Sequence, residues 1–367
     1  MKEVNNIYVI GIDHGYDSVK TASSIIPTAL AVYPDNPLFE HVGDTLECGG
    51  SRYRVGEGRK SFVKDKTVDD DFYLLTLAGI ARELNRAGLH AADVYLSAGL
   101  PVAWFQEQRQ AFQDYLTREK DVAFRFNGED YRVHIVGCEL HPQICAAAFE
   151  HTPCIQETCC MLADIGGRLV NMALFRDALP VEGHYATLEL GVRHCVSAAQ
   201  EEVRQKLNAE LDMETILRIL RGQISGIFGE YLELVEKARK EYVRELLRAL
   251  CGNGYDPGAM RLLLTGGGAL LTKDIWPGIS ERDDSPVRIE DNLHTAASGY
   301  ERIAAKNLEN GSGACTLRTL NVLFDLNDSA QRAAWERLQQ TPKESRSRAV
   351  LAAFMDEGER FRSRDSD

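Results

Sequence analysis

The spacing of apolar residues predicts short strands that alternate with longer amphipathic helices. Runs rich in β-branched and apolar residues are typical of strands, and they cover residues 7–13, 92–98, 161–163, 169–175 and 261–264. Apolar residues at helical spacing indicate helices over residues 74–84, 105–116, 143–149, 192–207, 213–220, 229–250 and 293–305. Alternation of this kind favours an α/β fold.

Turn residues indicate how neighbouring elements are joined. The alternating pattern over residues 18–23 resumes after the turn that follows Asp13, so we expect a β-hairpin there. A Gly-Gly pair separates the alternating runs 44–48 and 51–55 and predicts a second hairpin, because a tight turn between strands needs positive φ. The longest predicted helix is expected to end at a Gly252 cap.

The order strand, aspartate, glycine turn, strand and helices occurs twice along the chain. It is found first around Asp13 and again around Asp164, which predicts a duplicated α/β unit. An Asn-Gly-Ser-Gly run that ends at Gly313 has linker composition. The predicted regions are a first domain, a second domain and a tail, over residues 1–157, 158–310 and 314–367. The closing helix, over residues 293–306, is expected to pack back on the first domain.

Composition limits the classes of protein to which the chain can belong. Apolar residues make up 44% of the 367 residues and charged residues 26%, as in an ordinary folded protein. The charge, 42 − 55 = −13, disfavours nonspecific binding to nucleic acid or anionic membranes. No apolar run reaches the ~18 residues of a membrane span and no signal peptide is evident, so we expect a cytoplasmic protein. The nine cysteines lack zinc spacing, and we expect packed, reduced thiols.

Three glycine-rich turns follow predicted strands and carry groups that could hold a phosphate chain. We call them the first, second and third glycine turns, over residues 13–20, 164–171 and 264–270. Asp13 and Asp164 could hold Mg²⁺ through water, while Lys20 and backbone N–H groups could contact phosphate oxygens. Each turn alone fits an ordinary strand connection. Two aspartates at matching places in duplicated units favour a phosphate clamp instead.

The glycine turns resemble the nucleotide site of the superfamily that contains actin, the sugar kinases and the heat-shock chaperone ATPases. The first reads Asp-His-Gly-Tyr-Asp-Ser-Val-Lys, the second begins Asp-Ile-Gly-Gly, and the third reads Leu-Thr-Gly-Gly-Gly-Ala-Leu. A closing segment, Asn-Leu-His-Thr-Ala-Ala-Ser-Gly, begins at Asn292. Within the superfamily the chain is similar to the ParM/StbA family of bacterial plasmid-segregation actins, over residues 7 to about 305. The resemblance implies an actin-like (ribonuclease H-like) two-domain fold, with duplicated mixed-sheet units around a nucleotide cleft.

The same resemblance implies ATP and Mg²⁺ as cofactors and gives roles to particular residues. Asp13, Asp164 and Gln143 are the implied catalytic residues, and the two aspartates are also the implied Mg²⁺ ligands, through water. Gln143 would orient the attacking water with its carboxamide, although from the residues alone an exposed structural glutamine is the alternative. The implied nucleotide-binding residues come from the three glycine turns: Gly15, Tyr16, Asp17, Ser18, Lys20, Gly166, Gly167, Arg168, Gly266, Gly267 and Gly268.

The second glycine turn departs from the family pattern. The family usually has Thr and then Asp where this chain has Leu169 and Asn171, so a hydroxyl is lost and an amide replaces a carboxylate. We therefore expect slow or altered hydrolysis. Arg168 either contacts phosphate oxygens, which its guanidinium matches bidentately, or is a solvated surface residue.

The tail differs from the rest of the chain in charge. Residues 314–367 hold nine basic and nine acidic side chains, so the net charge resides in the preceding part. Alternation over residues 319–326 predicts a strand, and residues 329–339 and 345–355 predict helices. Strand, helix and helix resemble the ribbon-helix-helix module of ParR-type segregation adaptors, which implies DNA contacts. The alternative is a helical appendage that mediates protein contacts.

Taken with its residues, the resemblance implies an ATPase that assembles with copies of itself into nucleotide-dependent filaments. Such filaments would segregate plasmid or mobile-element DNA, bound directly or through a DNA-bound adaptor, with no membrane partner. Two alternatives stay open. One is a small-molecule kinase on the same scaffold, and the other is a nonenzymatic DNA-binding scaffold whose ATPase has degenerated.

Overall fold

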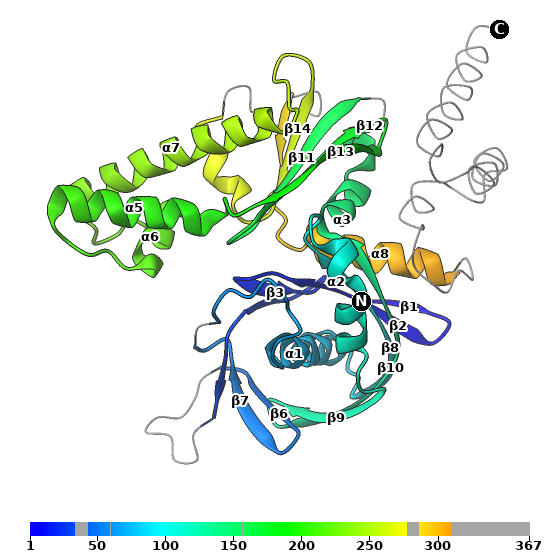
Figure 1. The fold of residues 1–367 in the computed structure, drawn as a ribbon. Helices are drawn as coiled ribbons and strands as arrows, with labels where there is room; N and C mark the ends of the chain where they lie inside the picture. Colours follow the sequence, from blue (N-terminus) through cyan, green and yellow to red (C-terminus); the bar gives the residue numbers. More distant parts are fainter. Residues whose placement is uncertain (34–42, 59, 156–157, 277–285, 310–367) are drawn as a thin grey trace, which may run out of the picture. The chain divides into compact units, whose positions relative to one another are not determined.

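The computed structural model describes residues 1–33, 43–58, 60–155, 158–276 and 286–309. The predicted tail, residues 314–367, lies outside the described residues. The described part contains two β-sheets with helices packed on them (Figure 1), which confirms an α/β fold with mixed sheets. None of its helices has both the length and the apolar character needed to cross a membrane.

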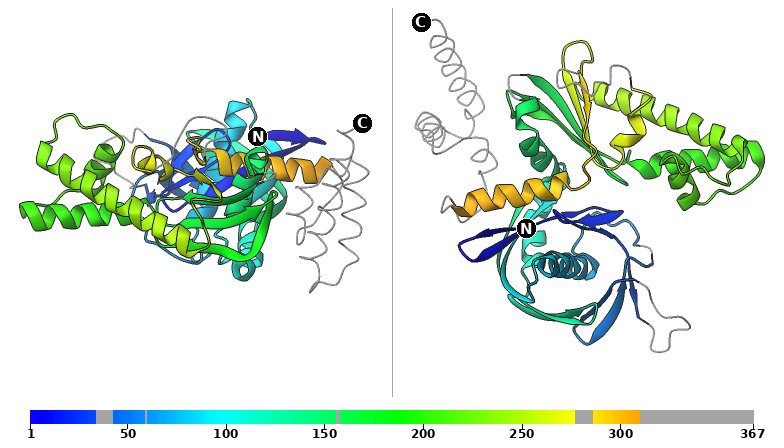
Figure 2. Two further views of the ribbon diagram at one scale, coloured as in Figure 1. Left: turned by 90° about the horizontal axis from the view of Figure 1, so that it is seen from above. Right: turned by 180° about the vertical axis from the view of Figure 1, so that it is seen from behind.

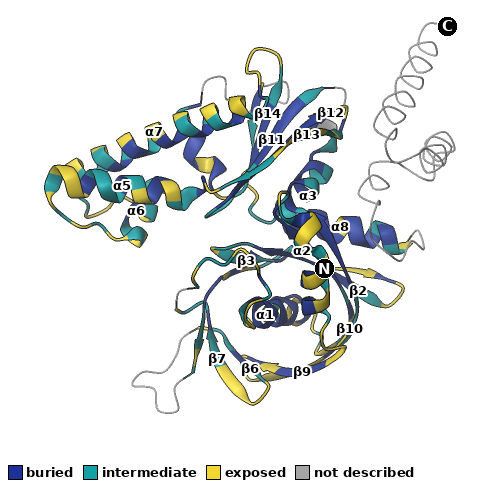
Figure 3. Ribbon diagram, in the orientation of Figure 1, coloured by how far each residue is buried: buried dark blue, intermediate teal, exposed yellow. Residues whose placement is uncertain are grey.

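The larger sheet curls around one helix, α1 (Asp71–Arg86) (Figure 1). Its strand order is β4-β3-β2-β8-β10-β9-β6-β7-β5, and β1 pairs with β2. In chain order these strands are Lys2–Val4, Ile7–His14, Ser18–Lys20, Ile25–Pro27, Leu30–Val32, Thr45–Cys48, Ser51–Val55, Ala91–Leu100, Asp121–Phe126 and Glu129–Pro142. β2, β8 and β10 are parallel, and antiparallel pairs flank them. Because the sheet surrounds it, α1 is buried on nearly every side (Figure 3).

The smaller sheet has helices on both faces. Its order is β13-β12-β11-β14-β15, and its strands in chain order are Cys159–Ile165, Val170–Arg176, Leu179–Leu188, Arg261–Thr265 and Val287–Ile289. Side chains alternate along β11: Met161 and Ala163 pack with α7 (Gly229–Gly252), whereas Cys160 and Leu162 pack with α3 (Gln143–Glu150). The remaining elements are α2 (Phe105–Leu116), α4 (Thr152–Ile155), α5 (Val192–Leu207), α6 (Met213–Leu220), η1 (Ala269–Thr272) and α8 (Thr295–Glu309).

Most elements lie where the apolar pattern predicts them. Helices α2, α5 and α6 begin and end at the predicted residues, and both predicted hairpins form as β2–β3 and β6–β7. The expected cap at Gly252 is wrong, because α7 includes this residue and the positive φ, 99°, belongs to Gly254. Seven described cysteines are free thiols, as expected, and Cys138, Cys160 and Cys195 are buried.

Helix α8 makes close backbone contacts with both β2 and α3. A Cβ at Gly11 in β2 would lie 1.9 Å from the Ala297 carbonyl oxygen, and a Cβ at Gly299 would lie 2.5 Å from the Ala146 carbonyl oxygen of α3. Figure 2 shows α8 against the outer face of the larger sheet in a second view. Both contacts involve backbone, so neither can relax by turning a side chain. The two glycines therefore set how closely α8 approaches its neighbours.

Substituting Gly11 tests this close packing. We expect Gly11→Ala to lower the free energy of unfolding by about 2 kcal/mol, because the methyl group must displace α8 from β2. Urea unfolding followed by circular dichroism measures the change. The matched control is Gly229→Ala, since no heavy atom lies within 4 Å of its Cβ position, and it should shift stability by less than about 1 kcal/mol. Equal stability of both variants would contradict the packing argument.

Candidate functional site

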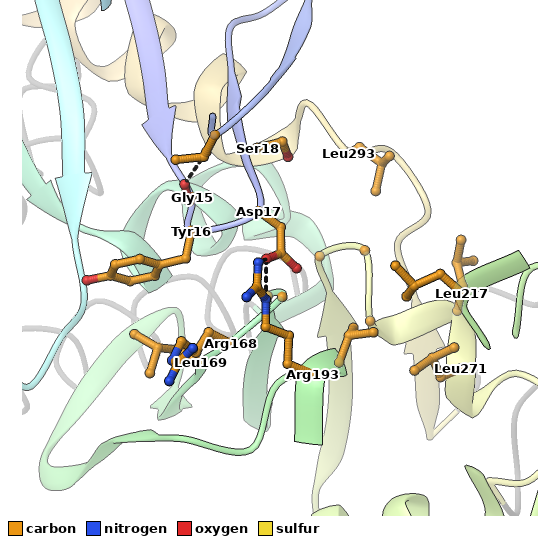
Figure 4. A pocket seen from close by; sticks show the side chains of 18 of the residues that line it. Gly15, Tyr16, Asp17, Ser18, Arg168, Leu169, Arg193, Leu217, Leu271 and Leu293 are labelled. Atoms are coloured by element: carbon orange, nitrogen blue, oxygen red, sulfur yellow. Dashed lines mark hydrogen bonds and ion pairs between the residues drawn. The ribbon is translucent and has the colours of Figure 1, made fainter. Parts of the chain in front are cut away.

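A cleft of about 1540 Å³ is lined by loops that extend from both sheets. Figure 4 shows part of its wall, with the first and second glycine turns facing each other. Every residue that the sequence singles out lines this cleft: Asp13, Gly15, Tyr16, Asp17, Ser18, Lys20, Gln143, Asp164, Gly166, Gly167, Arg168, Gly266, Gly267 and Gly268. The structure thus brings all of them together. Their individual roles stay predictions.

Asp13 and Lys20 form an ion pair across the first hairpin. They are register partners on β2 and β3, and Lys20 Nζ lies 2.8 Å from Asp13 Oδ2. Burial by itself would raise the pKa of Asp13, but the Lys20 ammonium and its hydrogen bond outweigh burial and lower it. The same ion pair raises the pKa of Lys20 against the opposing effect of burial. A carboxylate and an ammonium are therefore both held charged at the base of the cleft.

Gln143 connects this pair to the smaller sheet through buried amides. It is the first residue of α3, and its Nε2 donates to Asp13 Oδ1 at 3.3 Å. Its Oε1 accepts from Asn171 Nδ2 at 2.9 Å, and Asn171 Oδ1 in turn accepts from Thr187 Oγ1 at 2.8 Å. The alternative of an exposed structural glutamine is wrong, because the Gln143 side chain is buried. Its carboxamide faces the cleft between the two aspartate-bearing turns.

Asp164 is the last residue but one of β11, in the smaller sheet. Its Oδ1 accepts a hydrogen bond of 3.3 Å from Thr265 Oγ1, and a Cβ at Gly266 would lie 2.5 Å from the same oxygen. Gly266 also has a φ of 82°, which favours glycine on conformational grounds. Burial, followed by the Asp13 carboxylate, raises the pKa of Asp164 to about 6. A cation near both aspartates would lower this pKa.

The second glycine turn is fixed by the start of α5. Val192 N donates to the Gly166 carbonyl and Arg193 N to the Gly167 carbonyl, at 3.1 and 2.8 Å. Arg168 is half-buried, and its guanidinium lies 4.3 Å from the ring centre of Phe62. Arg168 Nε is buried and has no hydrogen-bond partner among the described residues. An orphaned guanidinium donor at this turn suits an anionic ligand.

Lys66 contacts the first glycine turn, and no motif or spacing in the sequence marks it. Its ammonium is buried, donates to the His14 carbonyl, and lies 4.9 Å from the Tyr16 ring centre. Burial lowers the pKa of Lys66 to about 8, although Asp13 acts in the opposite direction. Its position depends on a fold that brings Lys66 into contact with His14, 52 positions earlier in the sequence. Spacing along the chain cannot reveal such a residue.

Leucine side chains line the other end of the cleft, beside charged side chains that include Glu236, Arg239 and Lys273. Leu217 of α6, Leu271 of η1 and Leu293, which precedes α8, line it (Figure 4). A ligand that fills the whole cleft therefore has a flat or apolar part at this end and an anionic part beside the glycine turns. The described residues contain no group of three or more His, Cys, Asp or Glu side chains that could hold a metal. Mg²⁺ would thus depend on Asp13 and Asp164, on waters and on ligand oxygens.

The raised pKa of Asp164 predicts a pH-dependent stability. Since the folded pKa is about 6 and the unfolded pKa about 3.9, the folded state favours the protonated acid, and stability is lost as pH rises through 4 to 6. We expect Asp164→Asn to stabilise the ligand-free protein by about 1–2 kcal/mol at pH 7.5, a value discounted for the partial exposure of the side chain. The gain should shrink toward pH 4.5.

Urea unfolding at the two pH values measures this difference, with Asp93→Asn as the control. Asp93 is an exposed aspartate at the start of β8, so its substitution removes the same charge outside the cleft. The control should show the same stability change at both pH values. A stabilisation by Asp164→Asn that does not grow between pH 4.5 and 7.5 would contradict the charged-state argument.

Comparisons with known proteins agree with this geometry. Residues 11–144 match the family model described as the actin-like proteins N-terminal domain. A sequence search of curated proteins gave no significant match. Solved structures similar to this chain include ParM proteins and an archaeal actin homologue.

Three of these structures are informative because each aligns over nearly its whole length. A ParM filament from Clostridium botulinum has a TM-score of 0.64 at 20% identity, covering 82% of this chain and 99% of that chain. The archaeal actin homologue Ta0583 in complex with ADP has a TM-score of 0.61 at 18% identity, covering 82% and 100%. Bacillus thuringiensis ParM with AMPPNP has a TM-score of 0.59 at 14% identity, covering 84% and 100%. Residues 11–144 are thus similar to the N-terminal domain of the actin-like proteins, and the chain has the actin-like fold of these ParM structures.

Proposed function

We propose that this protein is an actin-like ATPase that binds ATP and Mg²⁺ in the cleft and assembles into filaments that segregate plasmid or mobile-element DNA. The observation that carries the proposal is the cleft itself, where two aspartate-bearing glycine turns face each other across a buried carboxamide. In this proposal the domains predicted over residues 1–157 and 158–310 contribute one such turn each. The protein would act in the cytoplasm.

Charge and shape support a nucleoside triphosphate as the ligand. Lys20 and Arg168 supply cationic donors beside the glycine turns, and the leucine-lined end of the cleft accommodates a planar base. Two structural neighbours were solved with ADP and with AMPPNP. Asp13 and Asp164 would hold Mg²⁺ through water, and the ion would neutralise charge on the phosphate chain when bound.

Gln143 is the side chain best placed to orient an attacking water. Its amide nitrogen is committed to Asp13 and its oxygen to Asn171, so the carboxamide plane is fixed from both sides. A second lone pair on Oε1 and a second proton on Nε2 remain available to a water. Asp164 lies near the end of β11 and would receive the proton that the attacking water loses. Asn171, which replaces the family's usual carboxylate, provides no base, so slow hydrolysis remains our expectation.

Nucleotide-dependent assembly tests the proposal directly. We expect ATP with Mg²⁺ to produce a pellet on sedimentation and a rise in light scattering, and ATP-free protein to produce neither. Lys20→Met should weaken ATP binding by roughly 10- to 100-fold and raise the ATP concentration needed for assembly, because a charge-assisted contact is lost. The control is Lys237→Met, which removes an exposed lysine of α7.

Assembly by Lys20→Met at the same ATP concentration as Lys237→Met would contradict the assigned role of Lys20. Absence of any ATP-dependent pellet from the unaltered chain at high protein concentration would reject the filament function. Calorimetry with ATP and Mg²⁺ on the same samples separates loss of nucleotide binding from loss of assembly.

Residues 314–367 are our candidate for contact with DNA or a DNA-bound adaptor. The preceding residues carry 42 − 9 = 33 basic and 55 − 9 = 46 acidic side chains, so their net charge of −13 repels DNA. The tail is neutral and holds nine basic residues. We expect the full chain, and not a chain ending at Asn310, to retard DNA from upstream of the gene in a gel-shift assay. Equal retardation by both chains would exclude the tail as the contact.

A further inference from the structure

An ion pair joins the first glycine turn to the helix that supports the second. Arg193 Nη2 lies 2.6 Å and Arg193 Nε 2.7 Å from the same oxygen, Oδ1 of Asp17. Figure 4 shows the carboxylate and the guanidinium facing each other in the cleft. Asp17 belongs to the loop between β2 and β3, whereas Arg193 is the second residue of α5. The pair therefore connects two segments that pack with different sheets.

The other oxygen of Asp17 lies against the second glycine turn. A Cβ at Gly167 would lie 1.7 Å from Asp17 Oδ2, so this approach is possible only because residue 167 is glycine. The Gly167 carbonyl accepts from Arg193 N at 2.8 Å, which places the start of α5 beside the same turn. One carboxylate thus bridges a guanidinium and the backbone of the second turn. The Asp17 carboxylate lies between the two turns, where the proposed phosphate chain would bind.

A carboxylate is an unusual side chain for a phosphate-binding turn, because it repels phosphate. Lys20, Arg168 and Arg193 all line the cleft beside it, so the site is built for an anion. In the structure the anion that Arg193 binds is the Asp17 side chain. Both partners are more than one-third exposed, at 40% for Asp17 and 37% for Arg193, so the ion pair is weak and is easily exchanged.

We propose that Asp17 and Arg193 form a latch that the phosphate chain of the nucleotide opens by exchange. The guanidinium of Arg193 passes from the Asp17 carboxylate to a phosphate oxygen, and Asp17 turns toward solvent. A phosphate group offers more charge and more acceptor oxygens than a carboxylate, so the exchange favours the ligand. When phosphate leaves, Asp17 regains Arg193 and holds the two turns together. Arg193 is thus a positioning residue that senses phosphate, and Asp17 is its internal competitor. This inference rests on the proposed nucleotide function.

Affinity for AMPPNP, measured by calorimetry in the presence of Mg²⁺, tests the exchange. We expect Asp17→Asn to bind AMPPNP about 3- to 10-fold more tightly, because no competitor for Arg193 remains. Arg193→Gln should bind about 10-fold or more weakly, because the phosphate loses a donor while the Asp17 carboxylate stays unneutralised. In the Arg193→Gln background, Asp17→Asn should restore part of the affinity. Matched controls are Asp114→Asn on α2 and Arg204→Gln on α5, which remove the same charges from exposed positions outside the cleft.

A second measurement tests the Asp17–Arg193 ion pair in the absence of nucleotide. Thermal unfolding of the ligand-free protein should show coupling in the Asp17 and Arg193 double-mutant cycle, with the double variant destabilised by less than the sum of the single variants. An additive cycle would refute the latch. The exchange alone would be refuted if the unaltered chain binds AMPPNP but Asp17→Asn binds it no more tightly and Arg193→Gln binds it no more weakly. Absence of AMPPNP binding to the unaltered chain would refute the proposed function and, with it, the exchange.

Discussion

The candidate site depends on one continuous set of hydrogen bonds, buried at its centre and partly buried at its ends, that runs from Lys20 through Asp13, Gln143 and Asn171 to Thr187. Each member fixes the next, because donors and acceptors must match at every step. A charged carboxylate only accepts, so the amide nitrogen of Gln143 must face Asp13 and its oxygen must face away. The next residue must then be a donor. An asparagine at position 171 meets this requirement, whereas an ionised aspartate would place two acceptors in contact. The departure from the family pattern therefore fits the orientation of the carboxamide.

Local pattern predicted much of the fold and the backbone of the site. Amphipathic helices such as α5 have enough residues to define a period, and Asp-Gly turns mark strand ends, so these features could be located in the sequence. Three-residue strands such as β4 and β15 are too short to show a period, and their pairing depends on neighbours far along the chain. Side chains that act across the fold were also missed. In the sequence, Lys66 and Arg193 look like ordinary surface residues. Only the fold brings Lys66 into contact with His14, and Arg193 into contact with Asp17, in the first glycine turn.

Electrostatic balance explains how the cleft wall can hold so many charges. Asp13 is compensated by Lys20 and Asp17 by Arg193, while Asp164 has no cationic partner of its own among the described contacts and shifts its pKa upward instead. Arg168 remains over an aromatic ring with one donor unused. Beside the glycine turns, the described contacts therefore leave one acid and one guanidinium donor unbalanced. A ligand that carries both a divalent cation and phosphate oxygens would satisfy both at once.

The two glycine contacts of α8 have a mechanical consequence. The helix touches β2, which ends in the first glycine turn, and α3, which begins with Gln143, and in both places backbone meets backbone. Close-packed backbone resists compression and cannot be stretched without opening a void. Motions that keep both contacts are therefore those that turn these segments about α8 rather than pull them away from it. A turn of this kind moves atoms in proportion to their distance from the helix, so loops far from α8 would shift more than the residues that touch it.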